Sequence, residues 1–188
     1  MKRVRLVLVV AALLFAVVVV TGTCFAQGQA KATAADDTGQ VPSCKYCGMN
    51  REQFAFSRTY IEYDDGKAEG FCSIHCAAVD LAVHIDRFPK AIMVGDYSTK
   101  QLIDAEKAFW VIGGDKPGVM TKRAKWAFAT KEGADAFIKQ ASGTPGTFDA
   151  AMKATYEDMY QDTKMIRDRR AAKRKAMEEQ KRKEHSPK

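Results

Sequence analysis

The sequence lacks the length of a large enzyme and the composition of a membrane-embedded or disordered protein. Its 188 residues suit one domain or two very small ones and exclude a large multidomain enzyme. Hydrophobic residues make up 46% of the chain and charged residues 28%. This balance excludes a polytopic membrane protein and a disordered acidic chain.

Two further absences exclude common binding functions. The glycine-rich stretch 113–118 lacks the Lys-Ser/Thr ending and the strand-to-helix setting of a phosphate-binding loop, so it is interpreted as a turn or a binding loop. The basic C-terminal tail has no interleaved aromatic residues, and together with the export signal described next this argues against nucleic-acid binding.

The amino terminus predicts export from the cytoplasm. Three basic residues among the first five precede an apolar run over 6–20, and small residues follow up to Ala26, which is the order of a signal peptide. We rank cleavage before Gln27 first, an uncleaved membrane anchor over 6–26 second, and lipidation of Cys24 (a lipoprotein) third. All three interpretations predict a periplasmic or other extracytoplasmic location.

The net charge of +7 comes from the two ends of the chain. Residues 164–188 hold eleven Lys or Arg and four Asp or Glu, whereas residues 27–163 carry a net charge of −3. Apolar residues at helical spacing up to Ile166 predict a helix from about Phe148 that is packed at first and then solvated. Its basic end is interpreted first as a solubilising helix and second as a contact with anionic lipid headgroups at a membrane surface.

The middle of the chain predicts an α+β fold of two small related ββα(β) halves, followed by the C-terminal basic helix. Each half has two strands and then a helix, with a clear final strand only in the first half. The segment 27–42 is rich in Ala, Gly, Thr and Gln and predicts a flexible linker. The predicted strands are 54–63, 67–71, 91–94, 107–112 and 125–130, and the predicted helices are 74–88 and 134–141.

Four cysteines in two pairs are the most informative residues. Cys44 and Cys47 form a Cys-x-x-Cys motif, a spacing that lets two thiolates face one ion. Cys72 and Cys76 span the first turn of a predicted helix, so both lie on one face, where the helix dipole stabilises thiolates. Because a predicted hairpin separates the two pairs, they can converge on one site.

Met49 and His75 are further candidate donors beside these pairs. His84 lies nine residues after His75, about half a turn out of phase, so one helix cannot present both rings to one metal. His84 is therefore interpreted as a solvated helix residue.

Several interpretations of the cysteines stay open. Four cysteines in an exported protein are commonly disulfide-bonded, and four thiolates also supply a closed tetrahedral zinc site. The same thiolates with Met49 and His75 form a soft donor set that favours Cu(I), and the thioether makes Cu(I) our first hypothesis. A redox Cys-x-x-Cys enzyme is a minor fourth interpretation, because the motif follows a loop rather than a strand.

At these residues the sequence resembles the NosL family, accessory proteins of nitrous-oxide reductase assembly. The Cys-x-x-Cys-Gly-Met and Phe-Cys-Ser-x-x-Cys motifs also resemble the small TRASH and YHS metal-binding modules. The NosL resemblance covers most of 43–151, through Cys44 with Gly48-Met49, the hairpin leading to Phe71-Cys72-Ser73, the 110–120 loop, the Ala127-Phe128 strand, the 133–138 helix and the 146–149 exit.

The resemblance implies a fold of two ββαβ halves in an exported, usually membrane-anchored lipoprotein that binds one Cu(I) and supplies copper to the sulfide-bridged cluster of the reductase. The NosL resemblance implies that Cys44 and Met49 are the foremost candidate ligands and that Met120 is a weaker candidate. The TRASH-like pattern adds four more candidates, Cys47, Cys72, His75 and Cys76. The candidate metal ligands are therefore Cys44, Cys47, Met49, Cys72, His75 and Cys76.

We therefore expect an exported Cu(I)-binding metallochaperone without catalytic turnover, serving denitrification. Its expected partner is a copper-receiving cuproenzyme, nitrous-oxide reductase or its assembly factors. The alternative is an exported zinc-binding or disulfide-stabilised interaction module without metal transfer. The expected organisation is a signal peptide or N-terminal anchor at 1–26, a linker at 27–42, a NosL-like metal-binding domain at 43–148 with halves at about 43–97 and 98–148, and a C-terminal helix with basic tail at 149–188.

Overall fold

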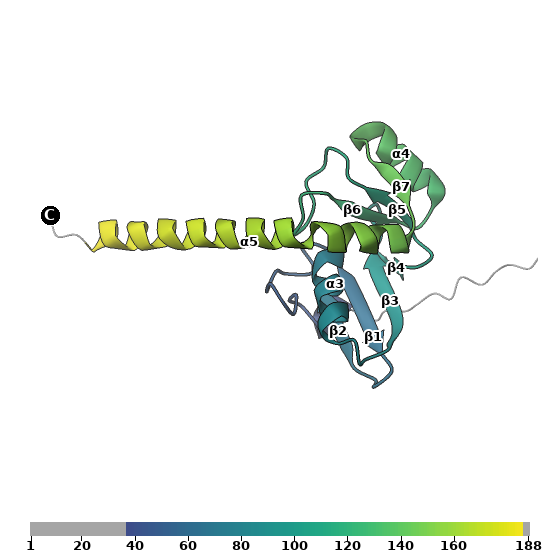
Figure 1. Ribbon diagram of the computed structural model, residues 1–188, viewed down its shortest axis with the longest axis horizontal. Coiled ribbons are helices and arrows are strands. Elements are labelled where there is room, and N and C mark those ends of the chain that lie inside the picture. Colours follow the sequence, from purple (N-terminus) through teal and green to yellow (C-terminus); the bar gives the residue numbers. More distant parts are fainter. Residues whose placement is uncertain (1–36, 186–188) are drawn as a thin grey trace, which may run out of the picture. The chain divides into compact units, whose positions relative to one another are not determined.

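The computed structural model describes residues 37–185, which form two small antiparallel sheets and four helices (Figure 1). The predicted export signal and most of the predicted linker lie outside the described residues. Among residues 37–185, no helix has the length and apolar character needed to span a membrane. The elements are α2 (Asp37–Gln40), β1 (Thr59–Tyr63), β2 (Ala68–Phe71), α3 (Ile74–Val83), β3 (Pro89–Gly95), β4 (Leu102–Asp104), β5 (Phe109–Ile112), β6 (Lys125–Phe128), α4 (Lys131–Ala141), β7 (Thr144–Gly146) and α5 (Phe148–Glu184).

The first sheet has the strand order β2-β1-β3-β4, and all its neighbours are antiparallel. A tight turn joins β1 to β2, and Gly66 in it has a φ of 78°, a conformation that favours glycine. Helix α3 then connects β2 to β3, which pairs with the other edge of β1. This half of the chain is thus a ββαβ unit extended by β4.

The second sheet repeats this arrangement with the order β6-β5-β7. Strands β5 and β6 are followed by α4, and β7 returns to pair with the free edge of β5. The α+β class and the two related halves are therefore confirmed. The boundary between the halves, placed near residue 97, stays a prediction, and β4 beyond it pairs with the first sheet.

The structure corrects several element boundaries. Strands β4 and β7 were not predicted, because a three-residue strand shows little sequence pattern and the residues of β7, Thr-Pro-Gly, are typical of a turn. Strand β1 begins at Thr59 rather than Phe54, since residues 51–57 form turns. Helix α3 ends at Val83 rather than Phe88, whose carbonyl instead accepts a hydrogen bond from the N–H of Asp64.

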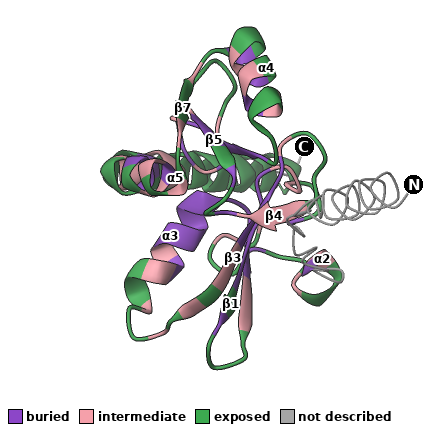
Figure 2. Cartoon of the chain, turned by 90° about the vertical axis from the view of Figure 1, so that its right-hand side faces the viewer, coloured by how far each residue is buried: buried purple, intermediate pink, exposed green. Residues whose placement is uncertain are grey.

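The C-terminal helix α5 begins at Phe148 as predicted. Its first turns contact α3, β5 and β7, and four of its residues are buried: Ala151, Ala154, Thr155 and Asp162. After Ile166 every described residue of the helix is exposed (green in Figure 2). The helix is therefore fixed to the core through its first half, and its basic second half has no packing role.

Candidate metal centre

The first cysteine pair lies in a tight loop, Cys44–Met49, which we call the knuckle loop. The N–H of Cys44 donates to the carbonyl of Met49 (2.9 Å), and the N–H of Gly48 donates to the carbonyl of Cys44 (2.9 Å). Gly48 has a φ of 73°, in the left-handed region that glycine adopts at little cost. The glycine of the Cys-x-x-Cys-Gly-Met motif therefore turns the chain back beneath its two thiols.

The second pair follows strand β2. Cys72 is the first residue after the strand, and Cys76 lies in the first turn of α3. The backbone here is held from two sides, because Ser57 Oγ donates to the carbonyl of Cys72 (2.9 Å) and Arg51 Nε donates to that of Phe71 (3.3 Å). The strand end and the helix start are thus fixed relative to each other.

The structure brings all four thiols together. The sulfur atoms of Cys44, Cys47, Cys72 and Cys76, hereafter the thiol cluster, all lie within 4.8 Å of one another. The Cys47 and Cys72 sulfurs are 3.4 Å apart and the Cys72 and Cys76 sulfurs 3.8 Å apart, and all four cysteines are free thiols. Three of them are at most 2% exposed, whereas Cys47 is partly exposed.

The thiols also polarise one another. Hydrogen bonds from Cys47, Cys72 and Cys76 lower the pKa of Cys44 far below that of an ordinary thiol. The hydrogen bond with Cys44 raises the pKa of Cys47, but those from Cys72 and Cys76 outweigh it and bring the pKa to about 7. The hydrogen bonds with Cys44 and Cys47 raise the pKa of Cys72, and their effect is larger than that of burial. The same two hydrogen bonds are the largest causes of the raised pKa of Cys76. The four thiols therefore titrate as one coupled group, and the metal-free cluster carries thiolate charge that its sulfurs share.

Met49 and Met120 are two methionines that pack against the same hydrophobic cluster as the cysteines. Both are partly buried and pack against the hydrophobic cluster that contains Cys44, Cys72 and Cys76. Met120 has a φ of 62°, which is uncommon for a residue with a side chain. Both methionines therefore belong to the same hydrophobic core as the cysteines, and their role as ligands stays a prediction.

The structure does not bring His75 to the sulfur atoms. No nitrogen of His75 belongs to the group of donor atoms within 4.8 Å of one another. Its Nδ1 instead lies 3.8 Å from Asp162 Oδ2 on α5, and burial lowers its pKa, so the ring is neutral at pH 7. His84 is half-buried, with Nδ1 3.3 Å from Asp80 Oδ1, rather than solvated as expected.

Asp80 is a functional residue that the sequence pattern did not predict. This carboxylate is fully buried on α3 and accepts hydrogen bonds from Tyr46 in the knuckle loop (2.7 Å) and from Tyr63 on β1. Lys45 Nζ lies 3.0 Å from the same carboxylate. In the sequence, Asp80 could have been noticed as a single acidic residue among the apolar residues of the helix.

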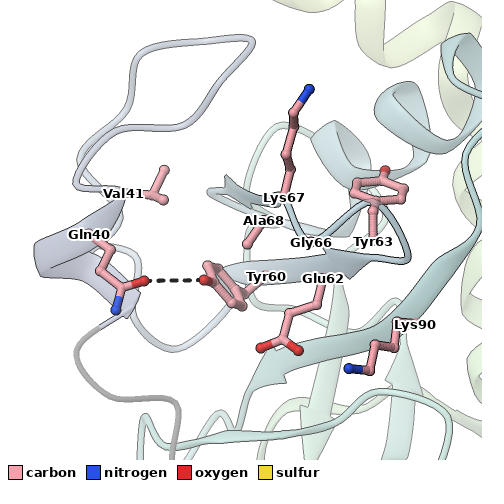
Figure 3. A pocket seen from close by; sticks show the side chains of 9 residues that line it. All are labelled: Gln40, Val41, Tyr60, Glu62, Tyr63, Gly66, Lys67, Ala68 and Lys90. Atoms are coloured by element: carbon pink, nitrogen blue, oxygen red, sulfur yellow. Dashed lines mark hydrogen bonds between the residues drawn. The ribbon is translucent and has the colours of Figure 1, made fainter.

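A surface depression of about 520 Å³ lies elsewhere on the molecule (Figure 3). None of the four cysteines lines it, and its wall is mainly polar. The lining residues are Gln40, Val41, Tyr60, Glu62, Tyr63, Gly66, Lys67, Ala68 and Lys90. The depression is therefore separate from the thiol cluster.

The thiol cluster has the donor chemistry of a soft-metal site. A tetrahedral zinc ion with Zn–S bonds of about 2.3 Å spaces its sulfurs about 3.8 Å apart, which the observed separations approach. Thiolates with neighbouring thioethers equally suit Cu(I). The residues present therefore fit either ion without a large rearrangement.

Comparison with known proteins identifies the family. The NosL family model matches residues 35–156, which include the whole thiol cluster and both sheets. A solved structure described as the copper chaperone NosL from Shewanella denitrificans is similar at 26% identity and a TM-score of 0.47, covering 57% of this chain and 87% of that one. No curated protein matches the chain significantly. Because the family match spans well over half of its residues, the chain belongs to the NosL family.

Proposed function

We propose that this protein is an exported metallochaperone that binds one Cu(I) ion as cargo and passes it to a copper enzyme. The observation that carries the proposal is the convergence of four free thiols within 4.8 Å. Met49 packs against the same hydrophobic cluster that contains three of the cysteines. Soft sulfur donors of this kind favour Cu(I), and membership of the NosL family supports the same cargo. The function is transfer, without catalytic turnover.

Transfer requires a route by which a partner's ligand can reach the copper. Cys47 is the partly exposed member of the thiol cluster, whereas the other three are buried. An incoming thiolate or thioether would therefore replace Cys47 first, while Cys44 and the second pair keep hold of the ion. Copper then leaves by stepwise ligand exchange and is never released as a free ion.

The partner and the location complete the proposal. The recipient is a periplasmic cuproenzyme, and the family points to copper-centre assembly in nitrous-oxide reductase during denitrification. The N-terminal apolar run would export the chain, and the basic end of α5 would attract it to an anionic membrane surface.

Anaerobic transfer of copper tests this function. Reduced protein loaded with one equivalent of Cu(I) is mixed with a copper-free thiol-rich acceptor, and copper on each protein is measured after rapid separation. We expect transfer at a rate that rises with acceptor concentration, and faster transfer from a Cys47→Ser variant, because the thiolate that the acceptor must replace first is already missing. A rate independent of acceptor concentration would show simple release and would refute the chaperone mechanism.

A second function remains a candidate because four thiols at these separations also form a closed zinc site. The protein would then be an exported interaction module stabilised by zinc, or by disulfides, without metal transfer. Metal analysis and thiol counting on protein isolated from its own compartment separate the two. Tightly bound zinc, or thiols that react only after reduction, would favour the module.

A further inference from the structure

Asp80 connects the helix of the second cysteine pair to the loop of the first. It lies four residues after Cys76, so both side chains project from the same face of α3, one turn apart. The Asp80 side chain is fully buried. A charge in such a position is costly unless its oxygens are paired.

The two residues between Cys44 and Cys47 supply much of that pairing. Tyr46 OH donates to Asp80 Oδ1 over 2.7 Å, and Lys45 Nζ lies 3.0 Å from the same oxygen. Asp80 Oδ2 accepts from Tyr63 on β1. The carboxylate therefore binds the knuckle loop through one oxygen and the first sheet through the other.

The charges agree with this geometry. Burial raises the pKa of Asp80, but hydrogen bonds from Tyr63, Tyr46 and Lys45 outweigh it and lower the pKa overall. Burial and the hydrogen bond to Asp80 raise the pKa of Tyr46. At neutral pH the charged Asp80 carboxylate therefore accepts a hydrogen bond from the protonated Tyr46 hydroxyl. Hydrogen bonds to a charged group are stronger than those between neutral groups.

We propose that Asp80 is a positioning residue that holds the Cys-Lys-Tyr-Cys knuckle loop over α3 and so sets how tightly the thiol cluster retains its metal. The proposal rests on the metal-binding function proposed above. Without this anchor, the Cys44 and Cys47 thiols would separate from Cys76 more often, and a bound ion would lose two ligands together.

The variant that tests the anchor is Tyr46→Phe, which removes the hydroxyl that reaches Asp80. The ring, which stacks on Phe71 with centroids 6.1 Å apart, is kept. Tyr46 is 37% exposed, so this change leaves the fold intact. The matched control is Tyr60→Phe, because the Tyr60 hydroxyl bonds to Gln40 (3.4 Å) in the surface depression and not to the knuckle loop (Figure 3).

The first measurement needs no metal. The reduced full-length protein is alkylated with iodoacetamide, and labelling of Cys44 is followed by mass spectrometry; cleavage after Lys45 places Cys44 and Cys47 on different peptides. Cys44 is 2% exposed and reacts only when the loop opens. We expect Cys44 to be labelled about tenfold faster in Tyr46→Phe. Loss of a hydrogen bond to a charged group shifts the equilibrium toward the open loop by at least about that factor. Tyr60→Phe should label at the wild-type rate.

The second measurement is the rate at which Cu(I) passes from each loaded variant to a chromophoric chelator. We expect about tenfold faster loss from Tyr46→Phe and no change in Tyr60→Phe. Equal Cys44 labelling in Tyr46→Phe and wild type would overturn the anchor, as would equally faster labelling in both variants. Failure of the wild type to bind Cu(I), with Cys44 still labelled faster in Tyr46→Phe, would refute the chaperone function and support the anchor.

Discussion

Single sulfur atoms distinguish the two metals that the thiol cluster can hold. Zinc is satisfied by four thiolates, whereas Cu(I) also binds thioether sulfur. Met49 ends the knuckle loop and packs against the hydrophobic cluster that contains Cys44, Cys72 and Cys76. Its contribution therefore bears directly on which metal the protein carries.

Met49→Leu should weaken Cu(I) binding and leave zinc binding unchanged. Leucine preserves the volume, so packing is nearly kept, while the thioether donor is lost. We expect the Cu(I) affinity to fall by about tenfold or more, as for the loss of a group that orients or binds a metal. Competition titrations with each metal check this. Met152→Leu is the control, because Met152 packs against a different cluster; equal losses in both variants, or none, would contradict a ligand role for Met49.

Gly48→Ala should lower both stability and metal affinity, because the φ of 73° is unfavourable for alanine. Gly66→Ala is a matched control, since Gly66 has a φ of 78° and an added Cβ would meet nothing within 4 Å at either position. Both variants should lose about 1 kcal/mol of unfolding free energy in denaturant titrations. Only Gly48→Ala should weaken Cu(I) binding. Equal metal affinities would show that the turn beneath the thiols does not fix their geometry.

At the scale of elements, a buried ionic cluster holds the start of the described chain against the first sheet. Asp37 on α2 accepts hydrogen bonds from both Arg51 and Arg58, at 2.7 to 3.1 Å. Arg51 is fully buried and also bonds to the carbonyl of Phe71, next to Cys72. The ionic cluster thus supports the strand end that carries the second cysteine pair.

Asp37→Ala should destabilise the protein by about 3 kcal/mol or more, because it leaves two guanidinium groups without their buried partner. The control is Asp135→Ala, which breaks an exposed pair with Lys131 (2.6 Å) on α4 and should cost far less, because water screens the two charges. Chemical denaturation of both variants gives the comparison. Similar small losses would mean that the arginines are satisfied by backbone carbonyls alone.

Helix α5 divides into a packed part and a basic part, and truncation should separate their roles. A chain from Gln27 to Thr163 retains every buried residue of α5 and has a net charge of −3. We expect its unfolding free energy to match that of the 27–188 chain to within about 1 kcal/mol. The longer chain should bind anionic lipid vesicles at low salt, and the truncated one should not.

Vesicles of zwitterionic lipid are the control for this experiment, and added salt should release the longer chain. Equal binding by the two chains would place the lipid contact elsewhere. Absence of binding by either chain would leave the basic helix with a solubilising role only.

At the scale of the whole molecule, the sequence was sufficient for the fold class and for the convergence of the thiols. The alternation of strands and helices and the spacing of the cysteines can both be recognised within short segments of the sequence, without knowledge of the tertiary structure. Strand β7 was missed because Pro145 and Gly146 are turn signals, and only pairing with β5 makes them a strand. Asp80 was missed because its partners are 17 to 35 residues away along the chain and meet it only in the folded protein.

The placement of His75 shows the same limit. Its proximity to Cys76 in sequence suggested a ligand, but adjacent residues of a helix point about 100° apart. The ring therefore faces Asp162 on α5 while Cys76 faces the other thiols.

Anaerobic titration with Cu(I) shows whether the thiol cluster binds copper. The reduced protein is titrated anaerobically with Cu(I) in the presence of a chromophoric Cu(I) chelator. We predict that one equivalent per chain is withdrawn from the chelator, and that Cys44→Ser loses this binding while retaining its fold. Copper that stays on the chelator throughout the titration, or binding that is the same in Cys44→Ser and wild type, would contradict the account.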